Sequence, residues 1–207
     1  MLLLDMQLKY GRVQMFVATR YATHQEVEFK CFKLHSHEWS LFITERRFME
    51  KGHFYYITDQ YFLDFPDPKL MNNKENIKGQ AHDRPCFYAF EDFNTGLYWM
   101  IPISSQVEKY RRYYNTKMAK YKRCDTIAFG QVLGHEKAFL IQNMCPITKK
   151  YIKNEYIDRI SNTPVQVDGI FQRELLEKAK RVLALQRKGV QLIFPDVLSI
   201  EKRLLSK

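Results

Sequence analysis

Short runs of hydrophobic residues, bounded by glycine, proline and asparagine, recur along the chain and are typical of short strands. In the clearest pair, at 86–90 and 97–103, the turn residues Asn94 to Gly96 separate two aromatic-rich runs and predict a hairpin. From residue 49 onward the predicted strands are 53–58, 86–90, 97–103, 126–133, 138–143, 164–167 and 190–194. Residues 71–80 are polar and are predicted to form a loop.

Apolar residues at helical spacing predict helices between these strands. The longest is predicted at 170–188, where Asp168 can cap the start and Gly189 can end the helix. A basic helix is predicted at 106–123, directly after the second hairpin strand. The other predicted helices are 59–65, one from Thr148 to Asp158, and one that opens at Pro195 and Asp196. Short, mostly antiparallel strands interrupted by helices predict the α+β class, as a small half-open antiparallel barrel.

The first 48 residues have fewer turn signals than the rest of the chain. Their strand-like runs are 13–18, 26–32 and 39–43. The residues from Glu45 to Phe48, directly before Met49, can be encoded by a purine-rich ribosome-binding sequence. Two interpretations stay open: residues 1–48 are a translated leader and the protein starts at Met49, or they are a β-rich extension of a domain spanning 49–207.

Composition and charge narrow the function classes. With 45% hydrophobic and 14% aromatic residues, the chain is typical of an ordered globular protein. Lys and Arg number 33 against 23 Asp and Glu, and the net charge of +10 favours a polyanionic partner. The four cysteines show no C-x-x-C spacing, so we expect free thiols in a reducing cytoplasm. No apolar run approaches the length of a membrane span, so no membrane association is predicted.

Two hydroxyls stand where the second hairpin strand meets the basic helix. Ser104 and Ser105 occupy this junction, and the amides and dipole of a helix start favour a phosphate there. Arg84 precedes the first hairpin strand and can hold a phosphate bidentately, and His82 can transfer a proton near neutral pH. No metal-ligand spacing accompanies these residues, so we expect neither a metal nor a cofactor. Ribonucleases can work without metal by using positioned side chains.

The basic helix is the candidate RNA-binding element. It carries seven Lys or Arg against one acid, a composition that favours contact with a phosphate backbone. The residues of this helix predicted to contact RNA are Tyr110, Arg111, Arg112, Lys117, Lys120, Lys122 and Arg123. Tyr88, in the first hairpin strand, is predicted to contact RNA as well.

These candidates also have structural interpretations. Ser105 to Glu108 fits the S-x-x-E capping box, in which the serine satisfies backbone donors. Tyr110, Tyr114 and Met118 recur at helical spacing, as residues that face a core do. The basic residues between them can form a solvated helix face, and Arg84 can be a surface ion-pair partner.

The strongest signal is a set of short segments taken together. The chain reads YWMIPISS from Tyr98 to Ser105 and RPCFYAF from Arg84 to Phe90. Further matching segments lie at 109–110, 124–127, 138–143 and 192–196. From Met49 to about Leu205 the chain therefore resembles the ToxN/AbiQ superfamily of type III toxin–antitoxin endoribonucleases, and within it the CptN-like branch.

The resemblance implies a PemK/MazF-like, SH3-type barrel with added helices. It also implies sequence-selective, metal-independent cleavage of RNA that leaves a 2′,3′-cyclic phosphate. The family's Ser/Thr-Ser pair falls on Ser104 and Ser105, and its basic residue opening the preceding strand falls on Arg84. Val107 stands where a family lysine is found, so the nearest lysine, Lys109, is the candidate for that role. One helical turn can bring Lys109 back towards the serines.

The resemblance also implies partners. The inhibitor is expected to be a small structured RNA, cut from a tandem-repeat precursor and bound in a cyclic protein–RNA assembly. Cellular or phage RNA is the expected substrate. Two other classes stay open from the sequence: a non-catalytic RNA-binding barrel, and a structural or partner-binding barrel that binds no RNA.

Overall fold

The computed structural model describes residues 6–9, 12–17, 30–32, 49–77 and 80–206, and the chain divides into two compact units, 1–48 and 49–207. In the first unit the described residues form an antiparallel sheet of β1 (Met6–Lys9), β2 (Arg12–Val17) and β3 (Lys30–Phe32), in that order. β2 and β3 overlap predicted strands, whereas β1 was not predicted. The run at 39–43 and the segment 45–48 lie outside the described residues. The two interpretations of residues 1–48 stay predictions.

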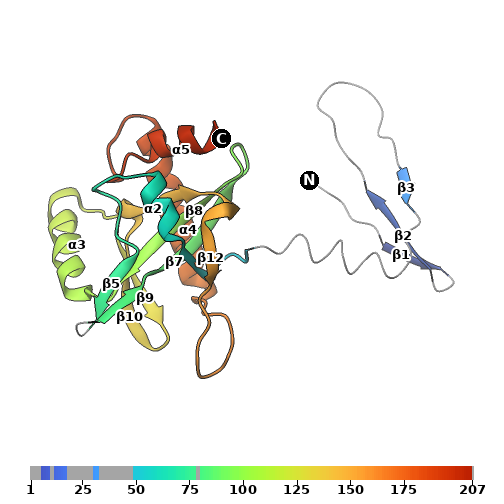
Figure 1. Cartoon of the computed structure of the whole chain (residues 1–207), viewed down its shortest axis with the longest axis horizontal. Helices are drawn as coiled ribbons and strands as arrows, with labels where there is room; N and C mark the ends of the chain where they lie inside the picture. The colour runs from blue at the N-terminus through green and yellow to red at the C-terminus, as the bar shows by residue number, and fades with distance from the viewer. Residues whose placement is uncertain (1–5, 10–11, 18–29, 33–48, 78–79, 207) are drawn as a thin grey trace. The chain divides into compact units, whose positions relative to one another are not determined.

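The described part of the second unit holds a seven-stranded sheet, a two-stranded sheet and four α-helices (Figure 1). The strands of the large sheet are β4 (Phe54–Ile57), β7 (Pro85–Asp92), β8 (Leu97–Ser104), β9 (Ala128–Val132), β10 (His135–Phe139), β11 (Cys145–Ile147) and β12 (Ile152–Glu155). The small sheet pairs β5 (Lys74–Ile77) with β6 (Gln80–Asp83). The helices are α2 (Asp59–Asp64), α3 (Val107–Tyr121), α4 (Gly169–Arg187) and α5 (Val197–Leu205), with 3₁₀ turns η1 (Ile141–Asn143) and η2 (Lys149–Tyr151).

Strand β8 is the centre of the large sheet. The strand order is β12-β4-β7-β8-β10-β9, with β11 also paired to β8, and each of these pairings is antiparallel. β7 pairs with β8 as the predicted hairpin, which is therefore confirmed. β10 pairs with Ile103 and Ser104, while β11 pairs with Tyr98 to Met100. The α+β class and the open antiparallel sheet agree with the sequence prediction, and the SH3-type barrel stays a prediction.

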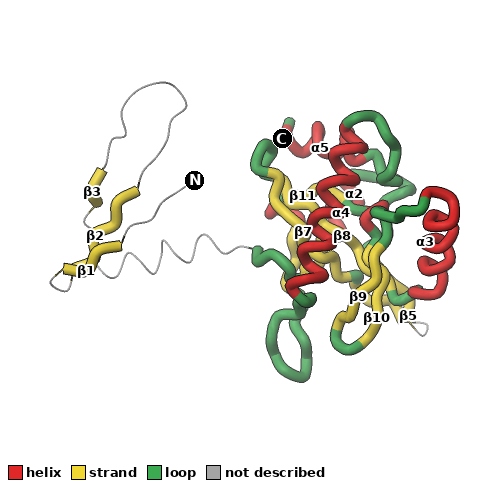
Figure 2. The backbone as a smooth tube through the Cα atoms, turned by 180° about the vertical axis from the view of Figure 1, so that it is seen from behind, coloured by secondary structure: helices red, strands yellow, loops and turns green. Residues whose placement is uncertain are grey.

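Alternating side chains of the sheet bury two separate cores. Phe54, Phe87 and Ile101 point to one face, where they pack in one cluster with residues of α4. Tyr55 and Met100 belong to the other face, which α2 and α5 cover. Figure 2 shows α4 lying across β7 and β8. This strand periodicity of two is why nearly every residue of β8 is buried, and it holds the end of the strand in a fixed position.

Helix α4 confirms the predicted cap and end of the longest helix. Asp168 accepts hydrogen bonds from the main-chain N–H groups of Ile170 (2.8 Å) and Phe171 (3.3 Å). At the other end, Gly189 has φ of +88°, a conformation that a glycine adopts without strain. The helix predicted to open at Pro195 and Asp196 is α5.

Five sequence predictions were wrong or incomplete in this unit. The predicted strand at 138–143 covers only the end of β10, and residues 141–143 form the 3₁₀ turn η1. The predicted loop at 71–80 contains β5 and the first residue of β6. The predicted helix at 148–158 is instead η2 followed by β12, because this segment pairs with the free edge of β4. Residues 164–167 make only isolated bridges, Ile157 to Pro164 and His53 to Gln166.

The predicted strand at 190–194 is a loop for a specific reason. The side-chain carbonyl of Gln186 accepts hydrogen bonds from the N–H groups of Leu192 (2.8 Å) and Ile193 (2.9 Å). The N–H of Phe194 donates to the carbonyl of Gln142 at 2.8 Å. These partners replace those of a strand, so the backbone is satisfied without a sheet.

Among the described residues, no helix has the length and apolar character needed to cross a membrane.

Candidate functional site

The junction between β8 and α3 brings the predicted serines to the edge of the sheet. Ser104 ends β8 opposite Ala138 of β10 and is only 2% exposed. Its hydroxyl oxygen accepts a hydrogen bond from Gln106 N at 3.2 Å. Ser105 is exposed, and its carbonyl accepts from Val107 N at 2.9 Å. The prediction that both hydroxyls face RNA is therefore corrected: Ser104 shapes the turn, and Ser105 is the one that solvent reaches.

The start of α3 has no side-chain cap from its N-cap residue. Gln106 holds that position, with φ of −79° and ψ of 55°, and its side chain makes no capping hydrogen bond. The capping-box interpretation, with Ser105 as N-cap, is therefore wrong. The first N–H groups of a helix lack partners inside the helix, and the dipole adds positive potential there. The arrangement suits a bound anion.

Arg84 is a buried cross-link rather than a surface residue. It is 7% exposed and lies between β6 and β7. Its guanidinium donates to the main-chain carbonyls of Ile103 (2.8 Å), Asn72 (3.0 Å) and Lys74 (3.5 Å). The bond to Ile103 joins the guanidinium to the peptide directly before the two serines. The structure thus brings Arg84 and the serine pair together, as predicted, but through the main chain, and the surface ion-pair interpretation is wrong.

The other two candidate catalytic residues are both exposed. His82 lies on β6, opposite Glu75 of β5. Lys109 lies in the first turn of α3, with its ammonium 5.6 Å from the centre of the Tyr110 ring. Beside His82, Asp83 forms ion pairs with Lys153 (2.8 Å) and Lys74, and these hydrogen bonds hold the pKa of Asp83 below its usual range.

One side of α3 packs on a small third core. Tyr110, Tyr114 and Met118 are partly buried against Cys124, Ile127, Ala138 and Leu140. The rings of Tyr114 and Phe129 meet edge to face, with centres 5.6 Å apart. The core-facing interpretation of these tyrosines is confirmed, although no residue of α3 is fully buried.

The other side of α3 and the two residues after the helix present most of the predicted cations. The exposed ones are Lys109, Arg112, Lys120, Lys122 and Arg123. Two predicted RNA contacts have carboxylate partners: Arg111 pairs with Glu136 at 2.6 Å, and Arg123 pairs with Asp125 at 2.7 Å. Arg111 also lies over the Phe129 ring, 4.3 Å from its centre. The Arg111–Glu136 pair is solvent-exposed on both sides, where an ion pair contributes little to stability, so a phosphate can compete for Arg111. Asp125 is only 15% exposed and also pairs with Arg181 at 3.2 Å, so it is the more enclosed of the two carboxylates.

Lys117 differs from the other cations of α3. Its ammonium donates to Thr126 Oγ1 (2.7 Å) and Gln142 Oε1 (2.8 Å), and burial lowers the pKa of Lys117. It lies 6.0 Å from the centre of the Phe194 ring. In the sequence Lys117 is one cation among seven, and no spacing signal marks its two partners, which lie 9 and 25 residues farther along the chain.

Tyr88 requires a correction. It is 3% exposed, and its ring meets Tyr55 and Tyr98 at centre distances of 6.5 Å and 5.7 Å. Burial raises the pKa of Tyr88. A ring enclosed in this core cannot reach RNA, so Tyr88 is removed from the proposed contacts.

Among the residues whose side chains are described, Cys86, Cys124 and Cys145 are free and buried, and no three His, Cys, Asp or Glu side chains are grouped as metal ligands would be.

Comparison with known proteins gives a structural similarity but no sequence match. No family model matches the chain, and no curated protein matches its sequence. The chain is similar in structure to AbiQ, a lactococcal anti-phage endoribonuclease that belongs to the type III toxin–antitoxin system. The TM-score is 0.53, with 14% sequence identity over 76% of this chain and 100% of the AbiQ chain. At this identity the similarity shows a shared fold.

Proposed function

We propose that this chain is an endoribonuclease that cleaves RNA at the junction of β8 and α3. One observation carries the proposal: the buried guanidinium of Arg84 binds the carbonyl of Ile103, directly before two serines at the start of a basic helix. The structural similarity to AbiQ, an endoribonuclease, supports the same activity here. In this proposal residues 49–207 form the nuclease domain, with an SH3-type barrel as its finer architecture.

In the proposed reaction, a ribose 2′-hydroxyl attacks the adjacent phosphorus. The O2′–P bond forms as the P–O5′ bond breaks, which leaves a 2′,3′-cyclic phosphate and a free 5′-hydroxyl. One group accepts the proton of the 2′-hydroxyl, and another supplies a proton to the leaving 5′-oxygen. Lys109 and His82 are the candidates for these transfers, and no metal takes part in the proposed scheme.

The start of α3 is proposed to hold the reacting phosphate. The exposed Ser105 hydroxyl and the first amides of the helix bind its oxygens, because N–H groups and the helix dipole both favour an anion. Arg84 is a positioning residue in this scheme, since its hydrogen bond to Ile103 fixes the end of β8. Its positive charge also favours an anion next to the serine pair.

The exposed cations of α3 are proposed to bind the RNA backbone, both of substrates and of an inhibitory RNA. An RNA that lies along α3 also covers Ser105, so it can inhibit without a protein antitoxin. The proposed inhibitor is a small structured RNA, held with the protein in a cyclic assembly. Because these contacts are made to phosphates, assembly is expected to weaken steeply with added salt.

Ser105→Ala tests the proposed site. The cleavage rate of single-stranded RNA is expected to fall by about 10²–10³, the usual cost of removing one group that stabilises developing charge. The unfolding temperature is measured beside the rate, so that a loss of cleavage can be told apart from a loss of folded protein. Ser206→Ala, which changes an exposed serine after α5, is the matched control and should keep the full rate. EDTA should leave wild-type cleavage unchanged.

Arg84→Ala is a weaker test, because it also removes the hydrogen bonds of the guanidinium to the carbonyls of Asn72, Lys74 and Ile103. Arg84→Lys keeps the charge but loses the planar fork, so its melting temperature must be measured beside its rate. Equal rates for wild type and Ser105→Ala would refute the site. Tight RNA binding by wild type without any cleavage would refute the nuclease and leave a non-catalytic RNA-binding protein.

A further inference from the structure

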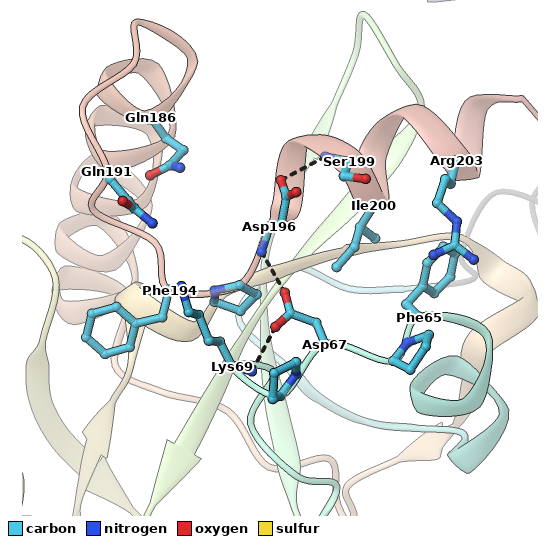
Figure 3. A pocket seen from close by; sticks show the side chains of 13 residues that line it. Phe65, Asp67, Lys69, Gln186, Gln191, Phe194, Asp196, Ser199, Ile200 and Arg203 are labelled. Atoms are coloured by element: carbon cyan, nitrogen blue, oxygen red, sulfur yellow. Dashed lines mark hydrogen bonds between the residues drawn. The ribbon is translucent and has the colours of Figure 1, made fainter.

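A groove lies where the loop after α4 meets the loop between α2 and β5 (Figure 3). It consists of two adjoining hollows, of about 580 Å³ and about 420 Å³. Both are lined by Lys69, Gln191 and Phe194. Both hollows are open to solvent, so they can receive part of a larger molecule without enclosing it.

Hydrogen bonds fix both walls of this groove. Asp67 accepts from the N–H of Asp196 at 2.7 Å, which ties the loop after α2 to the start of α5. Gln186 accepts from two N–H groups of the loop that carries Gln191 and Phe194, as described above. Figure 3 shows Gln186 and Gln191 on one side, with Asp67 and Asp196 on the other. The groove is therefore formed before any ligand binds, which lowers the entropic cost of binding.

The three residues common to both hollows present complementary chemistry. Phe194 is 47% exposed, so part of its ring can be reached by a base, while Lys117 lies 6.0 Å from the ring centre. Gln191 is exposed and carries both a donor and an acceptor on its amide. Lys69 supplies a positive charge, and Figure 3 shows its side chain running towards Phe194. An aromatic face, an amide and a cation together fit a nucleobase with its phosphate.

The groove is joined to the basic helix through Gln142. The N–H of Phe194 donates to the carbonyl of Gln142, and the side chain of Gln142 accepts from Lys117 of α3. Lys117 lies ten residues after Val107, or about 15 Å along an α-helix. An RNA strand that follows α3 from Ser105 therefore reaches the groove within a few nucleotides.

We propose that this groove binds one unpaired base of the RNA. The base stacks on Phe194, its edge bonds to Gln191, and the adjoining phosphate pairs with Lys69. This inference rests on the proposed function and deepens it, since the groove then helps to determine which RNA sequence is bound. The net charge of +10 favours a polyanion over other aromatic ligands.

Equilibrium binding of short RNA to the full chain tests the groove. The three probes are fluorescein-labelled octanucleotides, one of A, one of C and one of U. Every ribose is 2′-O-methylated, so that the proposed nuclease cannot cut them. Phe194→Ala is expected to weaken binding by between about 5-fold and 150-fold, the range for loss of base–aromatic stacking. Gln191→Ala should lose less affinity but should level the differences between the three probes.

The chain offers a matched control for each variant. Phe93→Ala removes a phenylalanine that is 87% exposed in the turn between β7 and β8, and Gln131→Ala removes an exposed glutamine of β9. Both should bind within about twofold of wild type. If Phe194→Ala binds as tightly as Phe93→Ala, or if wild type binds none of the probes, the groove is not a base site.

Cleavage of unmodified RNA is measured separately, so that the two proposals can fail independently. Binding that depends on Phe194 without any cleavage keeps the base site and removes the nuclease. Cleavage that depends on Ser105, with Phe194→Ala unchanged in binding, keeps the nuclease and removes the base site.

Discussion

Helices α3 and α5 begin with nearly the same backbone turn, but only α5 has a side-chain cap at its start. The N-cap of α5, Asp196, has φ of −77° and ψ of 69°, close to the values for Gln106 at the start of α3. In both turns the next residue is a valine whose N–H donates at 2.9 Å to the residue before the cap. Asp196 then accepts from Ser199 N at 3.2 Å, whereas Gln106 makes no capping bond.

The difference separates a structural helix start from one that suits a ligand. A carboxylate at the cap occupies the first amides and cancels the positive potential of the dipole, so an anion gains little there. Helix α4 is closed in the same way by Asp168. Helices α4 and α5 also each bury four residues, while α3 buries none fully. Of these three helices, α3 is the one whose start suits a phosphate.

Converting the start of α3 into that of α5 should have the largest effect. In Gln106→Asp, the new carboxylate is expected to cap the N–H of Lys109, as Asp196 caps Ser199. It then occupies the proposed phosphate site and repels the phosphate, so RNA cleavage should fall by about 100-fold or more. The same cap should stabilise the fold by about 0.5–1 kcal/mol. Initial rates of cleavage and the melting temperature measure the two effects.

Gln106→Asn separates occupation of the amides from charge repulsion. Asparagine caps as well as aspartate but is neutral. Its cleavage rate should therefore fall between those of wild type and Gln106→Asp. A stabilised Gln106→Asp variant with an unchanged rate would show that phosphate does not bind at this helix start.

Removing the side-chain cap of α4 should have a smaller effect, and it should change only the stability of the fold. Asp168→Ala removes the cap of α4 and is expected to cost about 1 kcal/mol, or about 2–4 °C in Tm. Its RNA cleavage rate at a temperature well below Tm should equal that of wild type. A fall in rate larger than the fall in folded fraction would link α4 to the reaction and break the contrast with α3.

The capped N-termini of α4 and α5 could be predicted from sequence, because a capping residue acts on amides only a few residues away. Asp168 and Asp196 lie within three residues of the amides they satisfy, and Gly189 acts on its own backbone. The hairpin of β7 and β8 was equally local, since its turn residues lie between its strands.

Apart from the cap at Ser105, the two clearest missed features depend on partners farther away along the chain. The segment after Thr148 has helical signals but pairs with β4, which comes almost 100 residues earlier. Residues 190–194 read as a strand, yet the amide of Gln186 and the carbonyl of Gln142 satisfy their backbone. No periodicity encodes such partners.

The candidate site was predicted in position but not in detail. A hairpin brings the residue before β7 next to the end of β8, so the meeting of Arg84 with the serine pair follows from strand register. Burial of Ser104 depends on β10, and the Asn72 and Lys74 carbonyls that accept from Arg84 depend on the loop before β5 and the first residue of β5. The sequence does not specify how those elements pack.

The smallest predicted effect compares single lysines on the two kinds of helix. Lys120 of α3 and Lys180 of α4 are both exposed and lie over an aromatic ring, Tyr121 at 5.0 Å and Phe90 at 5.8 Å from the ring centres. If α3 alone follows the RNA backbone, Lys120→Ala should lower RNA affinity a few-fold. It should also reduce the slope of log K against log salt by about 0.7, the value for one contact to a single strand.

Lys180→Ala makes the same chemical change on α4 and should alter neither the affinity nor the slope. Titrations of 2′-O-methylated RNA at several salt concentrations measure both quantities. If the two variants lose the same slope, the chain attracts RNA through its net charge of +10 alone. Because a contact changes the slope whereas long-range attraction is shared by every exposed lysine, this pair locates the RNA on the protein even though the change in affinity is small.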